Sequence, residues 1–346
     1  MRKETLYNKK SKTELKKKLE KENFKRKTLS FYKYVELNNL HDLRNNIYRC
    51  LNDLNILGRI YIAKEGINAQ ISIPIVNIKK FKNSLKNEFN FGSLNFKIAV
   101  QDGTSFYKLA VKIKTEIVAY NISSNEYNMN NTGKHLDYRE FNKLINQGAI
   151  VLDMRNYYES EIGKFENAII PDVVRSDELL PEVKKILKDN KDDKILLYCT
   201  GGIRCEKASS YLINLGFKDI NQLSGGIIKY AHDIKKNNVK SKFIGKNFVF
   251  DNRMSESITD DVIGSCHVCS KSSDRHINCY NEYCHILLIQ CTKCSKNLNN
   301  CCSKDCAEFL LLPIDERKKI FKDGKIKFNA QKTDKIRPKL KDINSL

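Results

Sequence analysis

Apolar and polar positions in residues 30–120 alternate between helical and strand spacing. The stretch 38–56 carries apolar residues three or four apart, as on one face of a helix: Leu40, Leu43, Ile47, Leu51 and Leu54. The runs 30–37 and 58–73 instead have strand character, the second as two strands joined by a turn at Lys64–Gly66. A helix at 76–89 and closing strands in 95–100 and 109–120 complete the order β-α-β-β-α-β. This order predicts a ferredoxin-like domain.

A different pattern begins after the polar stretch 121–134. Helices are expected at 137–148, 180–190 and 206–217, alternating with apolar strands at 149–155 and 194–199, and a short strand and helix follow within 219–234. Strands that alternate with helices predict a parallel sheet whose functional site lies at the carboxyl ends of the strands. The fold class is therefore expected to be multidomain, with an α+β part followed by an α/β part.

The pattern divides the chain into six segments. We expect a basic tail at 1–30, the ferredoxin-like domain at 31–120, a linker at 121–134, the parallel-sheet domain at 135–240, a cysteine-rich module at 241–312 and a second basic tail at 313–346.

Charge is concentrated at the two ends of the chain. The formal net charge is +21, and both residues 1–30 and residues 317–346 carry a large excess of Lys and Arg over Asp and Glu. Basic ends commonly neutralise nucleic-acid phosphates, although a composition rich in Lys and Asn gives the same excess without any partner. No secretory h-region and no apolar stretch long enough to span a membrane occurs, so a cytoplasmic protein with reduced cysteines is expected.

The segment LYCTGGIRCEK, residues 197–207, has the strongest chemical signal. Cys199 follows an apolar strand, and a helix is expected to open near Cys205. The loop Thr200-Gly201-Gly202-Ile203-Arg204 between them can turn several N–H groups inward, while the helix start and Arg204 add positive charge. These groups favour an anion at the Cys199 sulfur, which predicts a lowered pKa and a catalytic role.

Alternatives for the same loop are weaker. A zinc knuckle needs two cysteines two residues apart, whereas Cys199 and Cys205 are six apart. A phosphatase loop has one residue more between its cysteine and arginine. Cys205 itself is expected to pack in the helix, with a resolving role toward Cys199 as the alternative.

Nine of the twelve cysteines lie between residues 266 and 306. Their C-x2-C pairs indicate zinc, since this spacing lets two thiolates reach one tetrahedral ion. Two four-sulfur sites are expected, one with Cys266, Cys269, Cys291 and Cys294, the other with Cys279, Cys284, Cys306 and either Cys301 or Cys302. His267, His276 or His285 are possible substitutes, and reduced cysteines without metal are the alternative.

Three separated motifs give a family resemblance. LYCTGGIRCEKAS is similar to a rhodanese active-site loop, and VLDMRNYYESEIGKFENAI (151–169) resembles a second rhodanese segment. Together with AKEGINAQ (63–70), they resemble the rhodanese-domain tRNA uridine hydroxylases. The resemblance implies a ferredoxin-like domain, a rhodanese domain and a cysteine-rich region in that order.

The resemblance also implies an activity and its residues. The activity is oxygen-dependent hydroxylation at C5 of the wobble uridine of tRNA, giving 5-hydroxyuridine, with molecular oxygen as co-substrate. Cys199 matches the essential cysteine of the family. Asp153, Arg155 and Glu159 match supporting positions, where holding the loop by hydrogen bonds is at least as good an explanation as direct catalysis.

Several chemical roles remain open for Cys199. A thiolate that adds to C6 of uracil would make C5 carbanion-like, or the sulfur could carry the oxidising group as a sulfenate or cysteine persulfide. A plain sulfurtransferase and a non-catalytic RNA-binding module are the alternatives.

The sequence contains no flavin, nicotinamide or haem motif. His135 and Asp137 form half of an iron triad, but Asp137 is expected to cap a helix. For the tRNA anticodon loop, strand residues Tyr61, Asn68, Phe106 and Tyr107 are candidate contacts. The hairpin residues Lys64, Gly66 and Asn68 are the preferred RNA-binding candidates outside the rhodanese loop.

Overall fold

The N-terminal domain is built on a five-stranded sheet in which polar and apolar side chains alternate. The computed structural model describes residues 6–89, 91–324 and 327–331. The strand order is β4-β1-β3-β2-β5, with β5 parallel to β2 and the other neighbours antiparallel. The strands are β1 (Arg26–Tyr34), β2 (Leu57–Ala63), β3 (Gly66–Pro74), β4 (Lys97–Ile98) and β5 (Leu109–Ile113).

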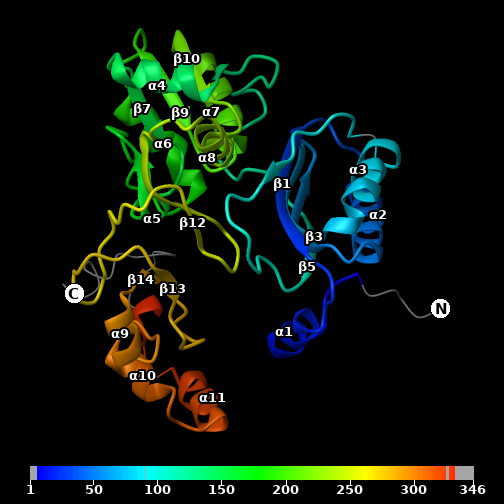
Figure 1. Ribbon diagram of the computed structural model, residues 1–346, viewed down its shortest axis with the longest axis vertical. Helices are drawn as coiled ribbons and strands as arrows, with labels where there is room; N and C mark the ends of the chain where they lie inside the picture. Colours follow the sequence, from blue (N-terminus) through cyan, green and yellow to red (C-terminus); the bar gives the residue numbers. More distant parts are fainter. Residues whose placement is uncertain (1–5, 90, 325–326, 332–346) are drawn as a thin grey trace.

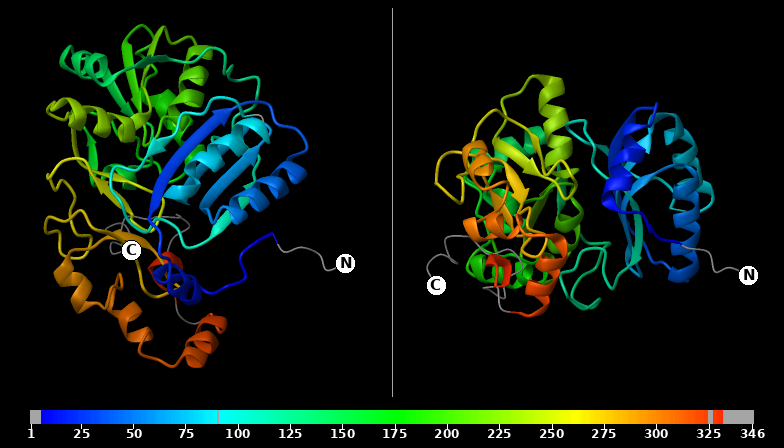
Figure 2. Two further views of the ribbon diagram at one scale, coloured as in Figure 1. Left: turned by 45° about the vertical axis from the view of Figure 1, so that its right-hand side comes forward. Right: turned by 90° about the horizontal axis from the view of Figure 1, so that it is seen from below.

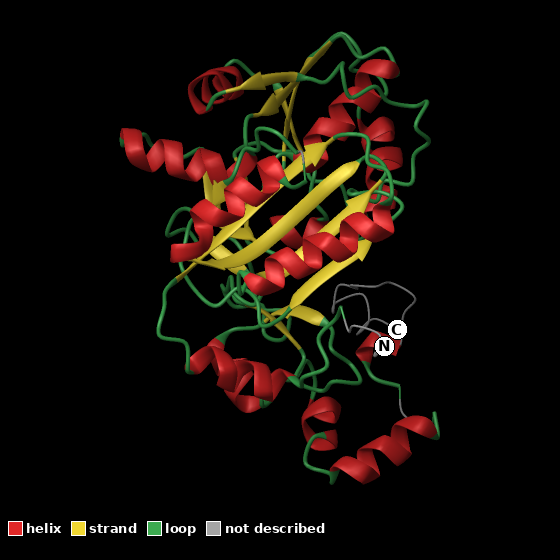
Figure 3. Cartoon of the chain, turned by 90° about the vertical axis from the view of Figure 1, so that its right-hand side faces the viewer, coloured by secondary structure: helices red, strands yellow, loops and turns green. Residues whose placement is uncertain are grey.

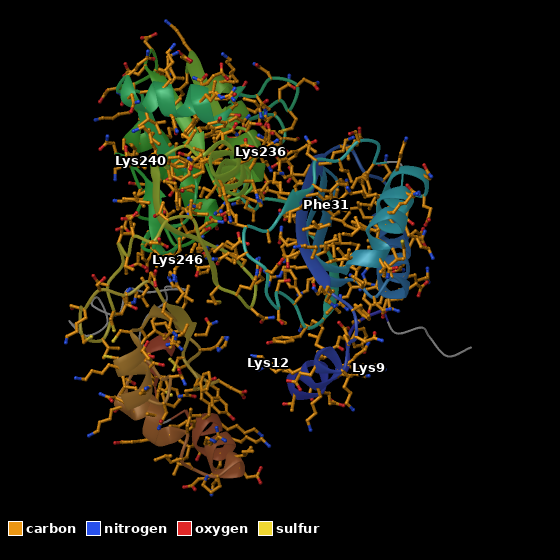
Figure 4. The ribbon with its side chains drawn as sticks, in the orientation of Figure 1. Lys9, Lys12, Phe31, Lys236, Lys240 and Lys246 are labelled. Atoms are coloured by element: carbon orange, nitrogen blue, oxygen red, sulfur yellow. The ribbon has the colours of Figure 1, made fainter. Side chains whose placement is uncertain are left out.

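Helices α2 (Leu40–Asp53) and α3 (Ile78–Asn87) cover one face of this sheet, as Figure 3 shows. Leu29 and Phe31 of β1 belong to the apolar core between the sheet and these helices, and Figure 4 labels Phe31 there. Because side chains alternate along a strand, Ser30 and Tyr32 point to the opposite face. The expected β-α-β-β-α-β order and the hairpin at 58–73 are both confirmed.

The N-terminal segment contains more structure than a tail. Helix α1 (Lys12–Glu20) begins with a capping box, in which Ser11 and Glu14 satisfy each other's backbone N–H groups. Strand β1 begins at Arg26, because its first residues pair with the end of β3. The expected tail 1–30 therefore includes one helix and the start of the sheet, while residues 1–5 lie outside the described residues.

The central domain contains the expected parallel sheet, in the order β6-β10-β9-β7. Helices α6 and α7 pack on one face and α4 and α8 on the other (Figure 1). The bounds are β6 (Lys134–Leu136), α4 (Tyr138–Asn146), β7 (Ile150–Asp153), α5 (Tyr157–Ser160), β8 (Gly163–Phe165), α6 (Ser176–Ile186), β9 (Lys194–Tyr198), α7 (Ile203–Asn214), β10 (Asp219–Leu223) and α8 (Gly226–Asn237). The short edge strand β6 was not expected and starts at the end of the predicted linker.

The C-terminal part begins with strands that pair with the central domain. β11 (Phe243–Phe248) lies between β8 and β12 (Ser255–Ser257) in an antiparallel sheet. The cysteine-rich residues follow, around the hairpin of β13 (His276–Asn278) and β14 (Leu287–Ile289) and helices α9 (Thr292–Asn297), α10 (Lys304–Phe309) and α11 (Ile314–Lys322). The expected second tail thus starts with a helix, and residues 332–346 lie outside the described residues.

Figure 2 shows the N-terminal domain beside the central domain in two further orientations. Figure 4 places Lys9 and Lys12 near α1, and Lys236, Lys240 and Lys246 on α8, β11 and the segment between them. These lysines therefore do not form one continuous basic patch. Within the described part of the chain, no helix is both long and apolar enough to cross a membrane.

Candidate functional site

Cys199 lies at the carboxyl end of β9, where a tight loop leads into α7. Gly202 adopts a positive φ of 96° and donates its N–H to the Cys199 sulfur at 3.1 Å. Hydrogen bonds from the start of α8 hold this loop in place. The N–H of Ile227 donates to Cys199 O at 3.0 Å, and the N–H of Ile228 donates to Thr200 O at 3.2 Å. Gly226 makes this approach possible, since a Cβ there would lie 2.5 Å from the Cys199 carbonyl oxygen.

The surroundings of Cys199 stabilise a thiolate. Burial alone would raise the pKa of this fully buried thiol, but the Cys205 side chain, the Arg204 charge and the N–H groups of residues 204 and 205 outweigh it and lower the pKa to about 5. Burial and the neighbouring Cys199 raise the pKa of Cys205 well above its usual range, so Cys205 remains a thiol and donates to the Cys199 sulfur. The arrangement therefore favours the thiolate form of Cys199 at neutral pH.

Arg204 is held in place by a carboxylate of the central domain. Its two terminal nitrogens donate to the carboxylate oxygens of the buried Glu159 at 2.6 and 2.9 Å. One of them also lies 3.3 Å from Thr200 Oγ1. Glu159 therefore acts through Arg204, fixing the direction from which positive charge faces Cys199.

Asp153 and Arg155 form a fully buried pair behind the loop. Arg155 Nε and Nη2 donate to Asp153 at 2.9 and 2.7 Å, and Tyr198 and Ser160 donate their hydroxyls to the same carboxylate at 2.6 and 2.7 Å. These hydrogen bonds join the ends of β7 and β9. The geometry therefore favours the structural explanation for Asp153 and Arg155.

A cavity of about 500 Å³ separates the Cys199 loop from the open face of the N-terminal sheet. The central domain contributes Cys199, Thr200, Gly201 and Arg204 to its lining, and the N-terminal domain contributes polar and aromatic strand residues. Those strand residues include Ser30, Tyr32, Arg59, Tyr61, Asn68 and Gln70. A substrate in this cavity would contact both domains.

The predicted RNA-binding residues are only partly brought together. Tyr61, Asn68 and Phe106 line the cavity, with Asn68 donating to Ile117 O at 3.2 Å. Lys64 is exposed at the β2–β3 turn and is not part of the cavity lining. Gly66 has a φ of 144°, and a Cβ there would lie 2.0 Å from the Lys33 carbonyl oxygen, so strand pairing requires this glycine.

Several residues at the domain boundary were missed by sequence reasoning. Lys207 on α7 is fully buried and donates to Glu65 of the hairpin at 2.7 Å. Tyr32 donates to Glu206 at 3.1 Å, and Lys97 reaches the cavity from β4. The sequence signal for Glu65 and Lys207 was their place inside the AKEGINAQ and GGIRCEKAS motifs; no pattern singled out Lys97.

His135 and Asp137, the two residues that could belong to an iron site, are instead engaged in local hydrogen bonds. Asp137 caps α4, accepting from the N–H groups of Arg139 and Glu140 at 2.8 and 2.9 Å, which confirms the capping prediction. His135 contacts Glu206 at 3.3 Å, and this hydrogen bond raises the pKa of the imidazole despite partial burial.

The cysteine-rich part contains two groups of four sulfurs that can each hold a metal ion. In each group the sulfur atoms lie within 4.8 Å of one another. One group is Cys266, Cys269, Cys291 and Cys294, and the other is Cys279, Cys284, Cys302 and Cys306. The close approach of four cysteine sulfurs in each group fits tetrahedral coordination of one metal ion by sulfur.

The structure places Cys302, rather than its neighbour Cys301, in the second group. Cys301 is also buried, but its sulfur lies 3.8 Å from the carbonyl oxygen of Asn299. None of the described histidines joins either group. His267 instead contacts Glu161 at 3.2 Å, and His276 packs edge-on against Phe248.

Three protein-family models match the chain in sequence. They are the UPF0176 acylphosphatase like domain at residues 26–117, the Rhodanese-like domain at 137–233 and the Rhodanase C-terminal at 244–307. These matches agree with the architecture described above.

Curated relatives match nearly the whole chain. A "tRNA uridine(34) hydroxylase" of Leptospira interrogans is 49% identical over 99% of this chain and 94% of its own length. Proteins with the same name from Photorhabdus laumondii and Escherichia fergusonii are 46% and 42% identical, covering 90% and 91% of this chain and the same shares of their own. These names favour the hydroxylase over the sulfurtransferase alternative.

Proposed function

Because the chain belongs to the tRNA uridine(34) hydroxylase family, we propose that it hydroxylates C5 of the wobble uridine in tRNA, with molecular oxygen as co-substrate and Cys199 as the reactive residue. The observation that carries the proposal is the placement of an anionic sulfur beside a cavity shared by two domains.

The chemistry of uracil explains why such a sulfur is useful. C5 of the ring is a poor target for oxygen until the ring is polarised. Addition of the Cys199 thiolate to C6 would place electron density at C5, which is nucleophilic catalysis of the covalent type. The Arg204 charge, held in place by Glu159, helps to keep the sulfur ionised for this attack.

The cavity supports access for a single base. A wobble uridine must leave the anticodon stack to reach a buried sulfur, as other base-modifying enzymes require. The aromatic ring of Tyr61 and the amides of Asn68 and Gln70 offer stacking and hydrogen bonding from the N-terminal sheet. Lys64, at the exposed turn, is the proposed contact to the RNA backbone outside the cavity.

We further propose that both four-cysteine groups bind zinc in a structural role. Each has four sulfur ligands and no described fifth protein ligand, which is typical of closed structural sites. Cys266, Cys269, Cys291 and Cys294 would hold one ion, and Cys279, Cys284, Cys302 and Cys306 the other. The metals would then hold together short helices and a two-stranded hairpin with few regular hydrogen bonds.

Nucleoside analysis of tRNA tests the activity. In cells lacking the gene, we expect 5-hydroxyuridine to return with the wild-type gene and with a Cys50→Ala variant, and to remain absent with Cys199→Ala. Cys50 is a suitable control because it lies in the N-terminal domain on α2, on the helix-covered side of the sheet. Wild-type 5-hydroxyuridine in Cys199→Ala cells would refute the role of Cys199.

A thiosulfate–cyanide assay of the purified protein separates the alternative function. A sulfurtransferase would form thiocyanate at a rate that depends on Cys199 without any tRNA. We expect tRNA hydroxylation to depend on Cys199 and sulfur transfer to cyanide to stay near background.

A further inference from the structure

Lys97, Arg59 and Lys114 line the cavity as cations of the N-terminal domain, and Lys97 is the one that lies next to Gly201 of the Cys199 loop. Lys97 lies on β4, where Ser30 of β1 is its pairing partner. Its ammonium nitrogen lies 4.3 Å from the centre of the Tyr32 ring, and its Cδ atom would be 3.8 Å from a Cβ placed on Gly201. The side chain therefore spans the space between the N-terminal sheet and the sulfur loop.

Contacts from the central and C-terminal parts fix the segment that carries Lys97. His232 on α8 makes a hydrogen bond of 2.9 Å with the carbonyl oxygen of Ile98. Glu256 accepts from the N–H of Val100 at 3.0 Å. Because the residues that directly follow Lys97 are held by these two contacts, Lys97 has a defined place beside the cavity.

Within the described residues, Lys97 forms no ion pair, whereas other cations near the cavity do. Arg204 is engaged by Glu159, Arg253 by Asp251 and Glu256, and Lys207 by Glu65 and Glu116. Among the described carboxylates, none lies within ion-pair distance of Lys97. Burial lowers the pKa of Lys97 to about 8, while the Cys199 sulfur and the Glu206 carboxylate oppose this shift.

The other titratable groups around the Cys199 sulfur do not supply the positive charge that Lys97 brings from the N-terminal domain. The groups that interact electrostatically with Cys199 include Arg204 and Cys205 of α7, Tyr32 of β1, Tyr120 at the end of the N-terminal domain, and Lys97. Burial raises the pKa of both tyrosines, so they stay neutral and Arg204 and Lys97 remain the positive charges. Glu206, whose pKa burial would raise, is kept ionised by His135, Gln222 and Tyr32.

We propose that Lys97 is a positioning residue for the Cys199 thiolate, a second cation supplied by the N-terminal domain across the cavity. The sulfur is then held between Arg204 of its own domain and Lys97 of the other. Full activation of Cys199 requires both domains. This proposal rests on the assignment of Cys199 as the reactive residue.

Alkylation of Cys199 tests the proposal without tRNA. Iodoacetamide is added to the purified full chain across a range of pH, and modification of the Cys199 peptide is followed by mass spectrometry. In Lys97→Met and Lys97→Gln, we expect the midpoint of the pH profile to rise by about half a unit or more, which slows alkylation about threefold below the midpoint. Lys97→Arg should restore the wild-type profile.

Lys79→Met is the matched control, because Lys79 is an exposed lysine on α3, on the other side of the same sheet. Thermal unfolding shows which variants are folded. Unchanged midpoints in both neutral variants would overturn the proposal, and so would a Lys97→Arg profile displaced as far as that of Lys97→Met. Since no tRNA is present, either result is independent of whether the protein hydroxylates uridine.

Discussion

The ammonium group of Lys207 is fully buried on α7 and donates to Glu65 at 2.7 Å and to Glu116 at 3.1 Å. Glu65 lies in the β2–β3 turn and also accepts from Tyr127 and from the N–H of Ile117. The helix that follows the sulfur loop is therefore joined to the hairpin of the other domain by a buried ion cluster.

Removing the cation of this cluster should destabilise the protein. Lys207→Met leaves two carboxylates close together without their partner, so the free energy of unfolding should fall by about 3 kcal/mol or more. Urea denaturation measures this change. Lys194→Met is the control, because its pair with Asp219 is well exposed and should contribute about 1 kcal/mol or less. Equal losses in the two variants would contradict the assigned role of Lys207.

The pH profile of Cys199 alkylation in the wild-type protein should differ from that of an ordinary thiol. With a pKa of about 5, the thiolate is fully formed at neutral pH, so the rate should be flat from about pH 6 to about pH 8 and fall as pH drops through 5. Cys50 serves as an internal control. Burial raises its pKa, so its alkylation should still increase over the same range.

The thiol of Cys205 is predicted to contribute to that profile. Cys205→Ala removes the hydrogen bond to the Cys199 sulfur and should raise the alkylation midpoint, whereas Cys205→Ser keeps a donor and should change it less. If Cys205 instead acted only as a resolving thiol, the midpoint would be the same in wild type and both variants.

Metal content distinguishes two adjacent cysteines. The purified chain should contain two equivalents of zinc, and Cys302→Ser should lose one of them. Cys301→Ser should keep both, because Cys301 lies outside either group although it is also buried. Elemental analysis by mass spectrometry gives both values, and a chain without zinc above background would exclude the structural metal sites.

The ring of Tyr61 is predicted to stack on RNA. Tyr61→Ala should weaken tRNA binding about fivefold or more at fixed salt, because stacking contributes about 1–3 kcal/mol per base. Tyr61→Phe keeps the ring and should bind as wild type does. Filter binding at one ionic strength measures the difference, and equal affinity of all three proteins would remove Tyr61 from the interface.

Local sequence patterns were sufficient to predict most helices and strands. The spacing of Leu40, Leu43 and Ile47 predicted α2, and the C-x2-C pairs predicted the first sulfur group completely. The choice of Cys302 over Cys301 could not be predicted, because adjacent residues share every sequence spacing and differ only in the direction of their side chains.

Contacts between the two domains could not be predicted from the spacing of apolar residues along the chain. Glu65 and Lys207 are separated by 142 positions along the chain, and Lys97 lies in a strand of two residues. Whether such residues meet depends on how two separately patterned units dock. The edge strand β6 was missed for a related reason, since three residues are too few to show alternation.

Gly226 packs against the backbone of the Cys199 loop and contributes no side chain to it. The backbone of Gly226 packs directly against backbone atoms of residues 199–201, so there is no room for a methyl group at position 226. A side chain at position 226 would displace the Cys199 loop, and this displacement would change the surroundings of the Cys199 sulfur. Position 226 consequently requires glycine for steric reasons alone.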